Sequence, residues 1–200
     1  KETNYIILTA SKLFTSMAKL SPQGFVRAYY PYAKEVEYSE GVPALVILGF
    51  ASFESGWGEK VKGNNFFGIK DSDGVNGNEQ LIDTTEYHKT DKFKYPVIKS
   101  IIKIKEYLFK YLIKDYFRKY DSPYESFLDY AKFLKRNPRY KIAFTHSDPY
   151  KFAEEIVKAG YATDPNYLVT LKKVMKMIEK NINNPLWVHP MTPLNNYMPY

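Results

Sequence analysis

A single glutamate, Glu54, closes the most apolar segment of the sequence, PALVILGFASFES. Gly56, which can end a helix, and Trp57 follow it directly. Acidic side chains are disfavoured at helix C-termini, because the helix dipole is negative there. A carboxyl group in an apolar, partly dry position keeps its proton more readily, as a general acid at neutral pH must. We therefore expect Glu54 to be a general acid, with an ordinary glycine-capped helix end as the alternative.

Acid-catalysed cleavage of a glycosidic bond needs a second carboxylate, or another group that stabilises the oxocarbenium ion and guides water. The sequence offers two candidates, Glu86 within TTEYHK and Asp129 within LDYAKFL. By sequence alone, Glu86 could equally be a solvated strand charge, and Asp129 a solvated helix residue or a buried cap. Tyr161, within AGYATDPNY, lies between two expected helices. Its side chain would either point into a cleft or pack at the helix corner.

The elements that would position these side chains are mainly helical. Apolar spacing, Ser-Pro or Asp-Pro starts and glycine stops predict the helices. Pro31 lies inside one of them and indicates a break or a restart. The expected helices span residues 3–19, 21–41, 43–56, 122–134, 148–159 and 164–181.

The remaining residues divide into a lobe and a tail. Residues 71–120 are rich in Ile, Tyr, Thr and Lys and carry turn signals, and we interpret them as a β-hairpin lobe, although parts would also fit a helix. The four prolines after residue 181 indicate a tail or linker over 182–200. We therefore expect one domain over residues 1–181 followed by that tail.

The composition excludes several classes of site. The chain has no cysteine, so it has no thiol nucleophile and no thiolate metal site. Its three histidines lack the spacing of metal ligands, and the acidic stretch 71–79 departs from the EF-hand pattern and is interpreted as a turn. We expect no metal and no cofactor.

Charge and aromatic content indicate the kind of partner. The 19 Tyr and 13 Phe either suit a groove for sugars, because a Tyr ring combines an apolar face with a polar tip, or reflect a Tyr-rich core and surface. The net charge of +7 favours an anionic partner, yet no nucleic-acid-binding motif occurs, so we expect no nucleic acid. No apolar run is long enough to span a membrane, and no signal peptide is visible after Lys1.

Taken in order, several segments together resemble glycoside hydrolase family 73, the bacterial peptidoglycan β-N-acetylglucosaminidases of autolysins and flagellar rod-assembly proteins. The resemblance covers about residues 25–178. One departure is the segment around 93–115, which is longer than the family pattern and would either lengthen the β-lobe or narrow the groove. The matching segments are FVRAYYPYAKEVEYSEGVP, FESGWG, NNFFGIK, TTEY, FRKYDSPYESFLDYAKFL, NPRYKIAF and AGYATDPNYLVTLKKV.

The resemblance implies an α+β, mainly α fold, in which a lysozyme-like α-lobe and a small β-hairpin lobe enclose a glycan groove. It implies that Glu54 is the general acid, that Glu86 is the base or stabiliser, and that Tyr161 lies near the reacting sugar. A catalytic role is also conceivable for Asp129, which we interpret as structural. The residues expected to line or support the groove are Trp57, Asn65, Phe66, Tyr87, Tyr120, Asp129 and Asp164.

The implied activity is hydrolysis of peptidoglycan at the β-1,4 bond after N-acetylglucosamine, by a monomer acting outside the cytoplasm. Water would be activated by Glu86, or the substrate's 2-acetamido group would attack first with help from Tyr161. The nearest alternative is a muramidase or lytic transglycosylase, which cuts after N-acetylmuramic acid. A second alternative is an inactive module that binds the cell wall.

Overall fold

The computed structural model describes residues 19–72, 75–162 and 164–184. Nearly all of the helix expected over 3–19, and nearly all of the tail expected over 182–200, lie outside these residues. The helices are α1 (Pro22–Glu40), α2 (Ala44–Ser55), α3 (Pro123–Arg136), α4 (Pro149–Ile156) and α5 (Tyr167–Ile182), with short helical turns at Pro138–Tyr140, Ala143–Thr145 and Val157–Tyr161. The strands are β1 (Glu79–His88), β2 (Val97–Lys105) and β3 (Leu108–Arg118).

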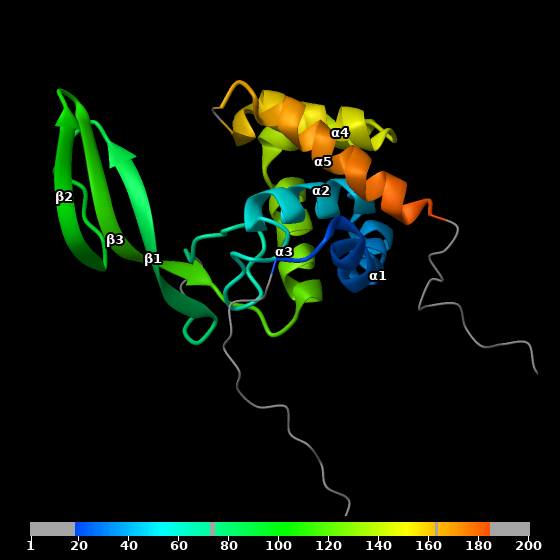
Figure 1. The fold of residues 1–200 in the computed structure, drawn as a ribbon, viewed down its shortest axis with the longest axis horizontal. Helices are drawn as coiled ribbons and strands as arrows, with labels where there is room; N and C mark the ends of the chain where they lie inside the picture. Colours follow the sequence, from blue (N-terminus) through cyan, green and yellow to red (C-terminus); the bar gives the residue numbers. More distant parts are fainter. Residues whose placement is uncertain (1–18, 73–74, 163, 185–200) are drawn as a thin grey trace, which may run out of the picture.

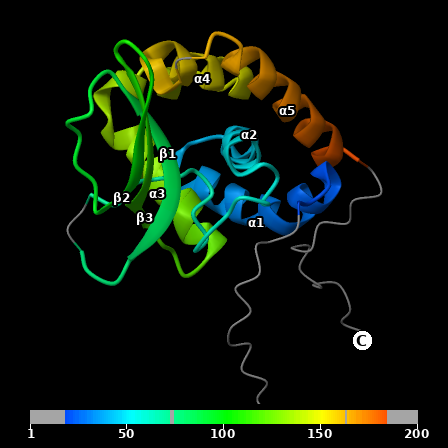
Figure 2. The ribbon, with the colours of Figure 1, turned by 60° about the vertical axis from the view of Figure 1, so that its left-hand side comes forward.

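Helix α2 lies at the centre of the helical lobe, among α1, α3, α4 and α5 (Figures 1 and 2). Its side chains are apolar all round, which is typical of a helix buried on every side. Val46, Ile47, Leu48 and Phe50 are fully buried. The most apolar segment of the sequence therefore forms the core, and its last turn carries Glu54.

Helix α1 corrects one expectation, because it runs through Pro31 without the break or restart that the proline indicated. A proline inside a helix lacks an N–H donor and crowds the preceding turn. Here buried side chains on both sides of it, Tyr29 before and Ala33 and Val36 after, hold the two halves against the same core. Tertiary packing thus outweighs the lost hydrogen bond.

The β-lobe is a three-stranded antiparallel sheet in the order β1-β3-β2, which confirms the interpretation of this region as strands. The segment around 93–115 forms β2, most of β3 and the end of the loop before them, so it belongs to the β-lobe. Figure 1 shows the sheet standing beside the helices. Together with the helical lobe it gives the expected α+β, mainly α fold.

The base of the sheet is joined to the loop that follows α2. The backbone N–H of Arg118 donates to the Ile69 carbonyl at 2.9 Å, and the Asn65 amide nitrogen donates to the Arg118 carbonyl at 3.0 Å. Lys70 and Phe117 form an isolated β-bridge beside them. The loop that begins just after Glu54 therefore fixes where the β-lobe stands.

Candidate active site

The turn after Glu54 is closed by a glycine. Gly56 adopts a left-handed conformation with φ of 59°, which a residue without a Cβ tolerates best. The Ser55 hydroxyl donates to the Ala51 carbonyl at 2.6 Å and accepts from the Gly58 N–H at 3.0 Å. The local sequence thus holds the end of α2, and with it the Glu54 side chain, in a defined position.

The Glu54 carboxylate accepts a hydrogen bond from the hydroxyl of Tyr167, the first residue of α5. Burial raises the pKa of Glu54, and it outweighs the hydrogen bond from Tyr167 and the charge of Lys60, which both lower it. Desolvation disfavours the charged form of a carboxyl group. Glu54 therefore retains its proton to a higher pH than an exposed glutamate, which is the property that a general acid needs.

Tyr167 is the site residue that sequence reasoning missed. It lies within the quoted stretch AGYATDPNY, but its place at the start of an amphipathic helix resembles that of an ordinary core residue. Asp164 sets this position, because its carbonyl accepts from the Tyr167 N–H at 3.0 Å and its carboxylate from the Asn166 N–H at 2.9 Å. The expected contribution of Asp164 is therefore a supporting one, through the start of α5.

Tyr161 ends the π-helical turn that follows α4, where Gly160 has a φ of 88°. Its ring packs edge-on against Phe50 of α2 at 4.9 Å and lies 6.1 Å from the Tyr167 ring. Burial first, and then the Glu54 charge, raise the pKa of Tyr161, so its hydroxyl stays protonated near neutral pH. Glu54, Tyr161 and Tyr167 thus form one cluster, which we call the Glu54 cluster.

Glu86 belongs to the other lobe. Its carboxylate pairs with the Lys70 ammonium at 2.9 Å, and the same ammonium pairs with Asp115 of β3 at 2.9 Å. No hydrogen bond or ion pair between the described residues joins Glu86 to the Glu54 cluster. The two candidate carboxylates therefore lie on different lobes, and Lys70 holds one of them to the loop that connects the lobes.

Asp129 is engaged in a partly buried network. It accepts from the Arg118 guanidinium at 2.7 Å and from the Tyr120 hydroxyl at 2.7 Å, and Arg136 lies 3.7 Å away. Its side chain is 17% exposed, and that of Arg118 is 18% exposed. The network connects α3 to the end of β3, which supports the structural interpretation of Asp129 and gives Tyr120 the same supporting role.

The other expected groove residues occupy varied positions. Asn65 is buried and bonds to the backbone of Ile69 and Arg118, and Phe66 is in the core at 1% exposure, so both support the site from inside. Trp57 is partly buried against Phe25.

Tyr87 is 58% exposed and follows Glu86 directly in β1. Successive side chains of a strand point to opposite faces of the sheet. The two residues therefore cannot line the same face of the β-lobe, and a groove that contains Glu86 is not lined by the Tyr87 ring.

Two cavities mark the junction of the lobes. The larger, of about 420 Å³, is lined by residues that include Lys70, Asp129 and Tyr161, and the smaller, of about 320 Å³, by residues that include Lys60 and Phe117. Gly68 of the connecting loop lines both. Within the described ranges, no group of three His, Asp or Glu side chains is placed to hold a metal ion.

Comparison with known proteins identifies relatives over most of the chain. The family model Glucosaminidase, described as mannosyl-glycoprotein endo-beta-N-acetylglucosaminidase, matches residues 30–181. The peptidoglycan hydrolase FlgJ of Vibrio parahaemolyticus is 33% identical over 166 residues, which cover 80% of this chain and 48% of that protein. A probable N-acetylmuramidase of Lactococcus lactis is 28% identical over 86% of this chain and 37% of its own length. The chain thus spans about half the length of the FlgJ relative and a smaller share of the Lactococcus lactis protein.

Solved structures agree with the fold. The glycoside hydrolase domain of Salmonella typhimurium FlgJ has a TM-score of 0.60 at 29% identity, with 80% of this chain and 89% of that chain covered. A peptidoglycan hydrolase mutant from Sphingomonas sp. A1 has a TM-score of 0.60 at 27% identity, covering 80% and 97%. The helical lobe and the β-lobe described above are therefore an arrangement shared with known glycan hydrolases.

Proposed function

Because the chain belongs to the Glucosaminidase family of glycoside hydrolases, we propose that it hydrolyses peptidoglycan glycan strands at the β-1,4 bond after N-acetylglucosamine. The name of the FlgJ relatives supports the substrate. The structural observation that carries the proposal is the environment of the Glu54 carboxyl group. This group is partly buried and accepts a hydrogen bond from Tyr167, and burial raises its pKa. It lies in the last turn of α2, just before the loop that joins the lobes.

In the proposed reaction, Glu54 donates its proton to the glycosidic oxygen as the bond from that oxygen to C1 breaks. Positive charge then develops at C1, and water adds there while Glu86 takes the proton from the water. Lys70 fixes the place of the Glu86 carboxylate through their ion pair. The placement of the carboxylates on different lobes also suits a second route, in which the substrate's acetamido group attacks and the Tyr161 hydroxyl orients it.

Glu86→Gln distinguishes these routes. If Glu86 activates water, the variant loses about 100-fold in turnover, whereas Tyr161→Phe loses less. If the acetamido group attacks, Tyr161→Phe is the slower variant. The measurement is the rate at which reducing ends appear in purified sacculi. Near-normal turnover of Glu86→Gln would contradict its role as the base and favour a mechanism with one acid.

Tyr167→Phe tests the hydrogen bond to Glu54. Removing a donor to the carboxylate removes an influence that lowers the Glu54 pKa, so that pKa rises further. The alkaline limb of the kcat profile should then move to higher pH, because the acid keeps its proton longer. The control is Tyr150→Phe, which removes a hydroxyl bonded to Glu179 at 2.7 Å, away from the Glu54 cluster. If the pH profiles of kcat for the Tyr167 variant and the wild type superimpose, Glu54 is not the acid that sets the alkaline limb.

A cut after N-acetylmuramic acid is the second candidate function, supported by the name of the Lactococcus lactis relative. Either cut implies action outside the cytoplasm, where peptidoglycan lies. We infer that one chain is sufficient, because both candidate carboxylates belong to the same chain and Lys70 holds Glu86 to the loop that follows α2, the helix of Glu54. None of the described helices has the length and apolar character needed to cross a membrane.

A further inference from the structure

The positive charge of the protein is concentrated in one part of the β-lobe. Residues 89–114 contain eight lysines and only two acidic residues, a net charge of +6 in a chain whose total is +7. The rest of the chain is therefore almost neutral. These residues include nearly all of the segment 93–115, which we expected to be longer than the family pattern.

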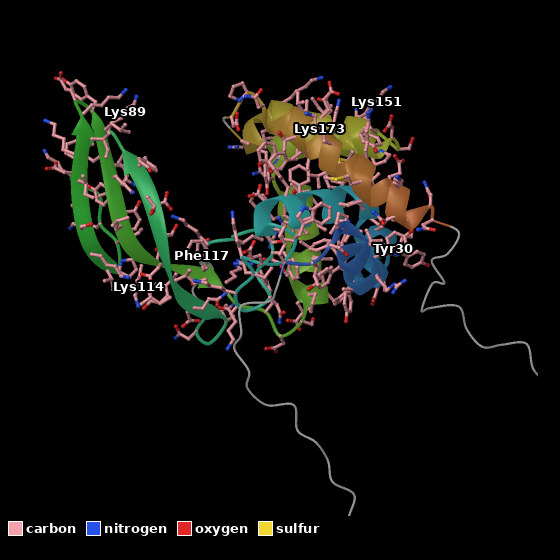
Figure 3. All side chains as sticks on the ribbon, in the orientation of Figure 1. Tyr30, Lys89, Lys114, Phe117, Lys151 and Lys173 are labelled. Carbon is pink, nitrogen blue, oxygen red and sulfur yellow. The ribbon has the colours of Figure 1, made fainter. Side chains whose placement is uncertain are left out.

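The basic segment is accessible and carries apolar side chains between its lysines. Strand β2 is at the edge of the sheet, and its isoleucines are 40–52% exposed. Among the described residues, Lys99 is the one lysine of the segment with an ion pair, to Asp83 at 2.5 Å. Figure 3 shows Lys89 near the far end of the lobe and Lys114 lower on the sheet, nearer the helices. We call the exposed side chains of residues 89–105, with Lys110 and Lys114, the basic β-lobe surface. In the register of β1 and β3, Lys110 pairs with Tyr87 and Lys114 with Asp83, so these two lysines lie on the sheet face opposite Glu86.

The loop at the end of β1 is held in place, so this surface has a defined shape. The Tyr111 hydroxyl donates to the Thr90 carbonyl at 3.1 Å and accepts from the Phe93 N–H at 3.3 Å. The Phe93 ring stacks on His88 at 3.7 Å. A fixed loop backbone loses less conformational entropy on binding than a flexible one.

We propose that the basic β-lobe surface binds the carboxylate-bearing peptide stems of the same peptidoglycan whose glycan strand occupies the space between the lobes; this inference rests on the proposed function. Lysines between exposed isoleucines match a peptide that carries both carboxylates and methyl groups. A phosphate polymer offers repeated charge without the apolar part. Stems repeat along the glycan and project from it, so a strand held at Glu86 presents stems at the edge strand β2, from which they reach the lysines on the opposite face of the sheet, and the contacts reinforce one another.

The test compares binding with charge reversals at two places. Lys89→Glu, Lys94→Glu and Lys105→Glu are combined in a Glu54→Gln background, so that binding is measured without turnover. The control combines Lys151→Glu on α4 with Lys173→Glu and Lys176→Glu on α5, and it changes the net charge of the protein by the same amount as the β-lobe variant. Lys151 and Lys173 are labelled in Figure 3. The probes are sacculi freed of phosphate polymers and glycan strands from which an amidase has removed the stems. Affinity is measured by co-sedimentation with sacculi and by calorimetry with the strands.

We expect the β-lobe variant to bind sacculi about tenfold more weakly than its parent at low ionic strength, and added salt to reduce the difference. Its affinity for stem-free strands should equal that of the parent, and the control should bind both probes like the parent. Unchanged binding to sacculi, an equal loss on stem-free strands or an equal loss in the control would each overturn the proposal. A loss that occurs only with walls retaining a phosphate polymer would assign the surface to that polymer instead. If the wild type releases no reducing sugar, the proposed function fails while these binding results still stand.

Discussion

Glu54→Gln lowers the hydrolysis of peptidoglycan by about 1,000-fold or more. Glutamine has nearly the same size and accepts the Tyr167 hydrogen bond through its amide oxygen, but it has no proton to give to the leaving oxygen. Loss of activity therefore isolates proton donation from packing. The release of reducing ends from purified sacculi measures it, and turnover within about tenfold of the wild type would remove Glu54 from the role of acid.

The same variant provides its own folding control. Burial raises the folded-state pKa of Glu54, so the folded protein holds this proton more tightly than the unfolded chain does. The stability that this group contributes is present at low pH and is lost as pH rises through the folded pKa. Glutamine does not titrate. Glu54→Gln should therefore melt at about the same temperature as the wild type in acid, and at a higher temperature than the wild type at neutral pH. A lower melting temperature at neutral pH would indicate that lost activity reflects damaged folding.

Asp129→Ala should lower the free energy of unfolding by about 2–3 kcal/mol, because it leaves Arg118 largely buried without its carboxylate partner. The Tyr120 hydroxyl loses its acceptor at the same time. The measurement is denaturant unfolding. The denaturant concentration at the midpoint should fall, while the slope of the unfolding free energy against denaturant concentration stays constant.

A matched substitution at the surface separates burial from charge. Asp83→Ala removes a carboxylate that pairs with Lys99 at 2.5 Å on the exposed sheet, and it should leave the unfolding midpoint almost unchanged. Asp129→Asn should keep measurable turnover, because it retains an acceptor for Tyr120 and its role is to support the site. Normal stability combined with lost turnover in Asp129→Asn would instead place Asp129 among the catalytic groups.

Local features of the sequence predicted the position of Glu54 well. The apolar run, the glycine stop and the Ser-Pro and Asp-Pro starts act within a few residues, and α1, α2, α3 and α4 begin within a residue or two of the expected positions. Pro31 was misjudged because the core packing that keeps α1 continuous comes from other elements. The choice of strands over a helix for residues 97–118 was confirmed, as the β-branched composition indicated.

The contacts of the site were less accessible to sequence reasoning. Tyr167 meets Glu54 across 113 residues, and Lys70 meets Glu86 across 16, and no local pattern predicts either pair. The partners of Asp129 and Tyr120 likewise depend on how α3 packs against the end of β3. Residue type and spacing could nominate the carboxylates, whereas only the fold shows which of them is partly buried beside a tyrosine and which is held by a lysine.

Identification of the sugar at the new chain end tests the central claim most directly. Purified sacculi are digested, the products are reduced with borohydride, and the terminal sugar is determined by mass spectrometry. Reduced N-acetylglucosamine is the result that the proposed glucosaminidase requires. Reduced or anhydro N-acetylmuramic acid would contradict it, because the cut would then lie at the other β-1,4 bond of the strand.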